Sequence, residues 1–227
     1  MYVMPGPIEP TNIIGGCIAE FENIWDIEKC KNYISQIEDV NSDSSNSIDF
    51  IPATTIGDIA NSTRTNSDMG LTQGAEVNEN LKKINNDFYQ TNNSAVMWYT
   101  NNFKIQDPIF YNEGFNILKY RGGERYGAHY DGGTDTGRAI SPILYLNDDY
   151  VGGELEFVNF NIKIKPTAGS LYLFPSNYAY RHIAHPVESG TKYAIVTWLH
   201  DRPYNYAQMP EGQLKNSAHT KSTHNHN

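Results

Sequence analysis

Hydrophobic residues follow two different periods along the chain. In the first half, apolar residues recur at helical spacing in segments 24–37 and 75–90, and each segment predicts an amphipathic helix. The second segment carries one apolar stripe, formed by Val77, Leu81, Ile84 and Phe88. Between the two, residues 52–74 are polar, contain several glycines and show no sustained period, so we expect an irregular segment there.

From about residue 113 the hydrophobic period shortens towards two. The short runs FNILKY, SPILYLN, GELEFV, IKIK, SLYLF and YAIVTWL are rich in β-branched and aromatic residues, with Gly, Pro, Asn and Asp between them. Six or more closely spaced strands separated by turn residues indicate a sandwich, a barrel or a jelly roll. We therefore expect a mostly β protein with flanking helices: a double-stranded β-helix (jelly roll) core with an N-terminal helical buttress.

These elements suggest one domain in three parts. Residues 1–110 are expected to form a helical and loop support region, residues 111–203 the jelly-roll core, and residues 204–227 a polar C-terminal tail. The tail ends in HTKSTHNHN, and we interpret its histidines as residues of a disordered tail rather than as metal ligands.

Composition excludes several classes of protein. The net charge of −9 argues against non-specific nucleic-acid binding, because an acidic surface repels phosphate, although a local basic groove stays open. No run of eighteen apolar residues is present to span a membrane, and the start MYVMPGPIEP lacks the basic and apolar regions of a signal peptide. Two cysteines, Cys17 and Cys30, are too few for a disulfide framework. We expect a soluble protein of the cytoplasm or another intracellular compartment.

A histidine and an aspartate stand two residues apart in the segment RYGAHYDGG. Residues i and i+2 of an extended segment point the same way, so His129 and Asp131 can reach one ion. A second histidine, His182, follows several turn-separated strands, in RHIAHPVESGTKY. Two imidazoles and one carboxylate on one face of a divalent ion leave three positions open, which is the arrangement of non-haem Fe(II) oxygenases.

A lysine, Lys192, enters the otherwise apolar run YAIVTWL ten residues after His182. A buried, unpaired ammonium is costly, and an acidic co-substrate would give it a partner. His185 competes with His182 as the distal ligand. We favour His182 because of its spacing to Pro186, its ten-residue step to Lys192, and its place directly after the aromatic stretch YAY.

These blocks, taken in order, resemble the 2-oxoglutarate- and Fe(II)-dependent dioxygenases, specifically their prolyl 4-hydroxylase-like branch. The resemblance covers about residues 115–200. LKYRGGERYGAHYD is similar to the first ligand block of that family, and ISPILYLNDDYVGGELEF to the hairpin after it. IKPTAGSLYLFPS is similar to the strand before the distal ligand, and HIAHPVESGTKYAIVTWLH to the closing block.

The resemblance implies a role for each residue of this set. His129, Asp131 and His182 would bind Fe(II). Lys192 would pair with the C5 carboxylate of 2-oxoglutarate, and Tyr120 would hydrogen-bond the same carboxylate. O2 would be the other co-substrate, and ascorbate the reductant.

The resemblance extends to the substrate side. Tyr126, Arg138, Trp198 and His200 match positions that contact the peptide in prolyl 4-hydroxylases, although Trp198 could equally be a core residue and Arg138 a surface charge. The common family sequence GGET is replaced by GGEL at 152–155. This change leaves the iron ligands intact, but a secondary co-substrate contact does not carry over.

The expected function is a 2-oxoglutarate-dependent dioxygenase that hydroxylates a prolyl residue in a peptide or protein and releases succinate and CO2. Another amino acid, a small molecule or a modified base are alternative targets within this class. A Zn(II) hydrolase on the same ligands and a jelly-roll binding module without activity are alternatives from other classes. Lys192 argues against the hydrolase, and its presence with Tyr120 beside all three ligands argues against the module. Segment 52–74 could act as a lid over the substrate or be an ordinary loop.

Overall fold

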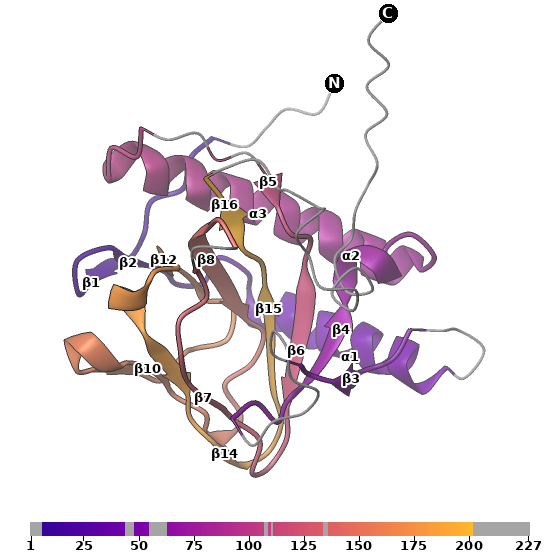
Figure 1. Cartoon of the computed structure of the whole chain (residues 1–227). Helices are drawn as coiled ribbons and strands as arrows, with labels where there is room; N and C mark the ends of the chain where they lie inside the picture. Colours follow the sequence, from indigo (N-terminus) through magenta and orange to yellow (C-terminus); the bar gives the residue numbers. More distant parts are fainter. Residues whose placement is uncertain are drawn as a thin grey trace, which may run out of the picture.

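Two β-sheets face each other in the computed structural model, and helices cover the outer face of the larger sheet (Figure 1). The structure describes residues 6–43, 48–54, 63–106, 109, 111–133 and 136–201. This arrangement confirms the predicted mostly β protein with a jelly-roll core and flanking helices.

The larger sheet has the strand order β1-β2-β12-β8-β15-β6-β4-β3, with β16 paired to β8 and β5 paired to β16. Its strands are β1 (Asn12–Ile14), β2 (Ile18–Phe21), β3 (Ile51–Pro52), β4 (Ser67–Gly70), β5 (Tyr111–Asn112), β6 (Asn116–Tyr120), β8 (Arg138–Tyr145), β12 (Leu171–Pro175), β15 (Lys192–Val196) and β16 (Leu199–His200). Strands from the two ends of the chain are neighbours here, since β12 pairs with both β2 and β8.

The smaller sheet carries the site. Its order is β11-β10-β13-β7, and a separate ribbon joins β14 to β9. The strands are β7 (Tyr126–His129), β9 (Val151–Gly152), β10 (Leu155–Phe157), β11 (Ile162–Ile164), β13 (His182–Ala184) and β14 (Val187–Ser189), with the 3-10 turns η1 (Val158–Phe160) and η2 (Tyr178–Tyr180). The two sheets contact through aromatic pairs such as Phe157 on Phe174, whose ring centroids lie 4.9 Å apart.

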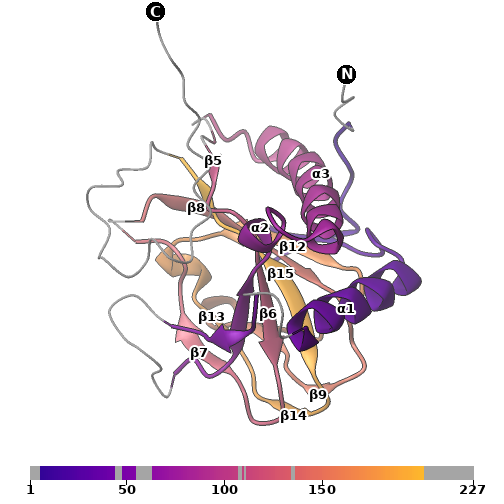
Figure 2. The same ribbon diagram turned by 90° about the vertical axis from the view of Figure 1, so that its right-hand side faces the viewer.

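Helices α1 (Ile27–Ser42), α2 (Leu71–Gly74) and α3 (Glu79–Asn102) lie on the side of the large sheet away from β7 and β13 (Figure 2). The side chains of Asp26 and Asn78 cap α1 and α3 by accepting hydrogen bonds from first-turn amides. Leu81, Ile84 and Phe88 are buried as predicted. Val77 is not on the stripe: it precedes the cap and is 73% exposed.

Strand β15 has one face in the main core and the other face in a cavity. Tyr193 and Ile195 pack in the main core between the large sheet and the helices, whereas Lys192, Ala194 and Val196 line a cavity on the opposite face. Successive side chains of a strand point to opposite faces, and here both faces are covered. An apolar run with one lysine is therefore buried throughout, and the lysine faces the cavity.

The expected support region of residues 1–110 is only partly helical and loop. Strands β1 to β4 come from it and join the large sheet, because their backbones pair with β12 and β6 regardless of their polar side chains. The segment 52–74 is likewise not irregular throughout, since it contains β4 and α2.

Two of the predictions concern residues outside those that the structure describes. Residues 55–62 of the candidate lid and the tail at 204–227 lie outside the described residues, so the lid and the tail stay predictions. Within the described ranges, no helix combines the length and apolar character needed to cross a membrane.

Candidate metal centre

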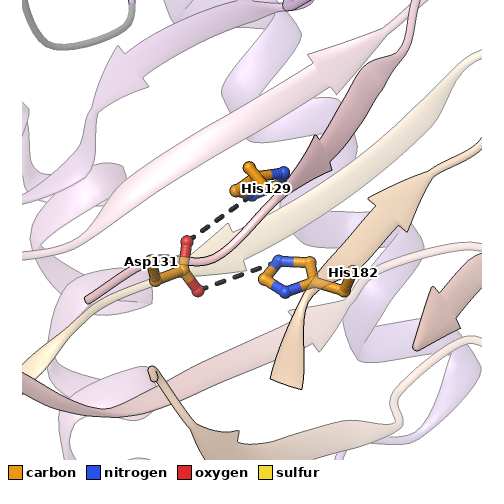
Figure 3. A group of neighbouring side chains, drawn as sticks. All are labelled: His129, Asp131 and His182. Atoms are coloured by element: carbon orange, nitrogen blue, oxygen red, sulfur yellow. Dashed lines mark ion pairs between the residues drawn. The ribbon is translucent and has the colours of Figure 1, made fainter. Parts of the chain in front are cut away.

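The predicted ligands meet where the edge strand β7 of the small sheet pairs with β13. β13 runs antiparallel to β7, and His182 is the direct cross-strand partner of His129. Asp131 follows β7 by two residues and its carboxylate lies between the two imidazoles (Figure 3). Nε2 of His129 is 3.5 Å from one carboxylate oxygen, and Nε2 of His182 is 3.8 Å from the other. One ligand atom from each residue can be chosen so that all three lie within 4.8 Å of one another.

Backbone carbonyls orient both imidazoles. Nδ1 of His129 lies 2.8 Å from the carbonyl oxygen of Gly127, and Nδ1 of His182 lies 3.0 Å from that of Tyr180. A carbonyl oxygen only accepts, so each Nδ1 carries a proton, and Nε2 is the nitrogen of each ring that is left to bind a metal. Such contacts fix the tautomer and ring orientation of metal-binding histidines.

Asp131 is held in its ionised form. Burial alone would raise the pKa of Asp131, but His182, His129 and the hydroxyl of Ser141 together hold that pKa well below its usual range. Ser141 donates to the carboxylate at 2.6 Å and also contacts Ser176. Burial, followed by the neighbouring His129, lowers the pKa of His182 to about 4. Two imidazoles and one carboxylate fit Fe(II), whose oxygenase sites use this donor set.

A cavity extends from these ligands to Lys192. Its wall includes His129, Asp131, His182 and Lys192. Lys192 is 1% exposed, and its ammonium donates to the carbonyl of Gly153 at 2.8 Å. Burial, with a smaller effect from Lys165, lowers the pKa of Lys192 to about 7.

Tyrosine rings surround the ammonium of Lys192. The ammonium lies 4.8 Å from the ring of Tyr120, 5.4 Å from that of Tyr145 and 5.9 Å from that of Tyr150. Tyr120 and Tyr145 also line the cavity, so two hydroxyl-bearing side chains stand beside the cation. Aromatic faces stabilise a cation that has left water. The end of the cavity at Lys192 is therefore polar, with one ammonium and two tyrosine hydroxyl groups.

The comparison with known families decides the identity of this region. The sequence profile of the 2OG-Fe(II) oxygenase superfamily matches residues 115–200, the stretch that carries the three ligands and Lys192. This part of the chain matches the 2OG-Fe(II) oxygenase superfamily, and we call it the oxygenase domain.

Curated proteins that are similar in sequence to this oxygenase domain include prolyl 4-hydroxylases. Prolyl 4-hydroxylase 13 of Arabidopsis thaliana is 30% identical over 127 residues, which cover 43% of this chain and 46% of that protein. Prolyl 4-hydroxylase subunit alpha-1 of Gallus gallus is 30% identical over 123 residues, or 44% of this chain and 24% of that protein. The chain therefore spans less than half the length of these two relatives.

A solved structure shares the fold of the oxygenase domain and its flanking helices. The prolyl hydroxylase of Trichoplax adhaerens, in complex with a peptide fragment of the hypoxia inducible factor oxygen degradation domain, gives a TM-score of 0.68 at 19% identity, and the match covers 82% of this chain and 84% of that one. At this level of identity, the likeness concerns the fold.

Two of the predicted substrate-contacting residues face the cavity of the oxygenase domain. Tyr126 and Trp198 both line it, and the ring of Tyr126 stacks on His129 with centroids 3.5 Å apart. Arg64 also lines the cavity, and its guanidinium lies over the ring of Tyr126, 4.9 Å from the centroid. Sequence reasoning missed Arg64, because a single arginine in a polar segment carries no distinguishing pattern.

Arg138 and His200 are joined behind Trp198 by a residue that the sequence did not single out. Glu113 accepts a bidentate pair of hydrogen bonds from Arg138, each 2.6 Å long, and it lies 2.6 Å from Nε2 of His200. The Arg138 guanidinium lies 3.9 Å from the ring centroid of Trp198. His200 is 1% exposed and contacts Arg138 through Glu113. Its contact with a substrate stays a prediction.

Removing the charge of Glu113 should destabilise the fold. Burial would raise the pKa of Glu113, but Arg138 and then His200 outweigh it and lower that pKa to about 2. Glu113→Gln leaves Arg138 buried without its counter-charge. We expect this change to lower the free energy of unfolding, measured by urea denaturation at pH 7, by about 3–5 kcal/mol. The wild-type contribution is present above the usual pKa near 4.5 and is lost as the pH falls towards 2.

The control for this prediction is Glu124→Gln. Glu124 pairs with Arg121 across 3.9 Å, and about half of the Arg121 side chain is exposed. An exposed pair contributes about 0–1 kcal/mol. Equal losses in the two variants would show that the buried charge of Glu113 has no special weight.

His185 does not join the metal ligands. Its Nε2 lies 2.6 Å from Glu156, on the side of β13 turned away from the cavity. Leu155, which stands where the common family sequence has threonine, lines the cavity with an apolar side chain.

Proposed function

We propose that this chain is a 2-oxoglutarate- and Fe(II)-dependent dioxygenase that hydroxylates prolyl residues in a peptide or protein. The observation that carries the proposal is one cavity with two chemically distinct ends. A three-ligand cluster stands at one end, and a buried lysine stands at the other. 2-Oxoglutarate has a metal-chelating end and a distal carboxylate, which matches both.

The role of His129, Asp131 and His182 is to hold Fe(II) on one face and leave the remaining positions to the co-substrates. When bound, Fe(II) supplies the activation of O2 that no amino-acid side chain can provide. The chain fixes both Nε2 lone pairs through carbonyls and fixes the Asp131 carboxylate through Ser141. The ligands therefore need little rearrangement to bind.

Lys192 would pair with the C5 carboxylate of 2-oxoglutarate, and Tyr120 would donate a hydrogen bond to it. In the free protein the ammonium has a carbonyl and three rings as partners. A carboxylate is a stronger partner for a buried ammonium than any of these. The apolar wall around it excludes water and strengthens the pair.

A peptidyl proline is the target that the relatives favour. Prolyl 4-hydroxylase is the name of the curated relatives in Arabidopsis and Gallus, and the Trichoplax structure holds a peptide. Tyr126 and Trp198 line the cavity, and aromatic side chains suit contact with the apolar ring of proline. The reaction would release succinate and CO2, with ascorbate as the reductant that keeps the iron in its ferrous form.

Lys192 also separates this proposal from the alternatives. A Zn(II) hydrolase on the same ligands has no need of a buried cation for a dicarboxylate. A binding module without catalytic activity has no need of three oriented ligand atoms. Of the other dioxygenase targets, a modified base fits poorly with the net charge of −9.

The test is a mass-spectrometric assay of proline-containing peptides with Fe(II), ascorbate and 2-oxoglutarate. We expect one oxygen atom to be added at proline and one succinate to be formed per hydroxylation. Succinate formation that depends on a free amino acid or a small molecule would move the target to another member of this class. Absence of succinate formation with every substrate would contradict the dioxygenase itself.

A further inference from the structure

Lys165 follows the last residue of β11, and its side chain contacts residues 150–153, which have no role in the proposed reaction. Its ammonium donates to the carbonyl oxygens of Tyr150 at 2.9 Å and Gly152 at 2.5 Å. The same ammonium lies 3.7 Å from the ring centroid of Tyr150. Although the residue is largely exposed, its charged end is bound at three points to one short segment.

That segment also holds the ammonium of Lys192. The carbonyl of Gly153, next in the chain to Gly152, accepts the hydrogen bond from Lys192 at 2.8 Å. The ring of Tyr150 lies 5.9 Å from the same ammonium. Residues 150–153 therefore lie between two lysines, one at the surface and one in the cavity.

This segment contains the two-residue strand β9, which pairs with β14, and its backbone geometry depends on such contacts. Gly152 and Gly153 have φ values of +72° and +67°, which glycine adopts without strain and other residues avoid. A side chain at Gly152 would come within 2.4 Å of the Pro186 carbonyl, so the position must remain glycine. Two successive glycines are the most freely rotating pair a chain offers, and their geometry depends on the contacts around them.

Tyr150 depends on Lys165 in a similar way. Its side chain is 5% exposed, and its hydroxyl is buried with no hydrogen-bond partner among the described residues. The ring is thus held by packing against Val187 and its neighbours and by the ammonium on its face.

We propose that Lys165 is a positioning residue for 2-oxoglutarate binding: by anchoring residues 150–153 it fixes the Gly153 carbonyl and aims the ammonium of Lys192 into the cavity. The inference rests on the proposed function. It carries weight in this chain because Leu155 offers no hydroxyl to the co-substrate, which leaves Lys192 as the charged contact for the distal carboxylate.

Removing Lys165 has a second effect that must be separated from positioning. After burial, Lys165 is the next cause that lowers the pKa of Lys192, so its loss favours the charged form of Lys192 and tighter binding at high pH. At pH 6 Lys192 is charged with or without Lys165, since its pKa is about 7. Binding measured at pH 6 therefore reports positioning alone.

The experiment measures the Kd of 2-oxoglutarate for the Fe(II)-loaded protein by anaerobic calorimetry at pH 6. We expect Lys165→Met to weaken binding by about 3- to 30-fold, which lies within the range of coupling between residues of one hydrogen-bonded network. The turnover number at saturating 2-oxoglutarate should stay within about twofold, because the metal ligands are untouched. Lys165→Arg, which keeps the charge and the donors, should restore most of the affinity.

Lys163→Met is the matched control. Lys163 lies two residues earlier, on β11, is exposed, and pairs with Glu156 across 3.6 Å, so its loss should leave Kd unchanged. Circular dichroism at the assay temperature checks folding, and Lys165→Gln replaces the methionine variant if that variant unfolds.

Each outcome decides something. Unchanged or tighter binding in Lys165→Met at pH 6, or a fall in turnover number instead of affinity, would overturn the positioning role. A wild-type protein that binds no 2-oxoglutarate under these conditions would overturn the proposed function first, and this inference with it.

Discussion

Replacing His129 with alanine should abolish Fe(II) binding and turnover together. The imidazole of His129 is one of only two nitrogen ligands in the cluster, and no other described side chain stands ready at its position. Loss of a residue that merely supports a ligand costs about 10- to 100-fold in metal affinity, so loss of the ligand itself should cost more than about 100-fold. Calorimetric titration with Fe(II) under nitrogen, followed by a succinate assay, measures both effects.

His185→Ala is the matched control for this experiment. His185 stands three residues from His182, and its imidazole is bonded to Glu156 on the other side of the strand. Its removal should leave iron affinity and turnover within about twofold of the wild type, since it touches neither the ligands nor the cavity. If His129→Ala kept full activity while His185→Ala lost it, the ligand assignment would be wrong.

The sequence predicted the metal cluster because its logic is local. His129 and Asp131 share a side of an extended segment, and this follows from a period of two. The same period of two also distinguishes His182 from His185, because extended residues three positions apart point to opposite faces and cannot both reach the ion. The cross-strand pairing of His182 with His129 could not be derived from spacing, since it depends on which strands become neighbours.

The parts that the sequence did not predict depend on long-range pairing or on buried polar contacts. Strand β4 has the sequence SDMG, which has no β signature, and it forms because β6 offers a free edge. Glu113 gave no sign of its role, because an acidic residue in a loop is usually solvated. Only the fold brings it between Arg138 and His200, 25 and 87 residues away.

Lys192→Met should remove most of the affinity for 2-oxoglutarate while iron binding stays intact. Methionine matches the length of the lysine stem but leaves the C5 carboxylate buried without a cation beside it. Truncating one partner of a buried charge pair costs on the order of 2–5 kcal/mol, or about 30- to 4,000-fold in Kd. Calorimetry with Fe(II)-loaded protein measures this change, and a separate Fe(II) titration checks the metal site.

The control is a second buried lysine in the same sheet. Lys119 of β6 is 5% exposed and pairs with Glu38 on the helix side, opposite the cavity. Lys119→Met should lower stability without changing the Kd of 2-oxoglutarate. If the two variants lost affinity equally, the effect of Lys192 would reflect general damage to the sheet rather than its contact with the co-substrate.

The pH dependence of wild-type binding follows from the same residue. The pKa of Lys192 in the free protein is about 7, lowered mainly by burial, and a bound carboxylate raises it. Below pH 7 the ammonium is already charged, so affinity should be nearly constant there. Above pH 7, binding must first take up a proton, and Kd should rise by up to about tenfold per pH unit. Lys192→Met should remove this dependence, and a pH profile that persisted in the variant would assign it to another group.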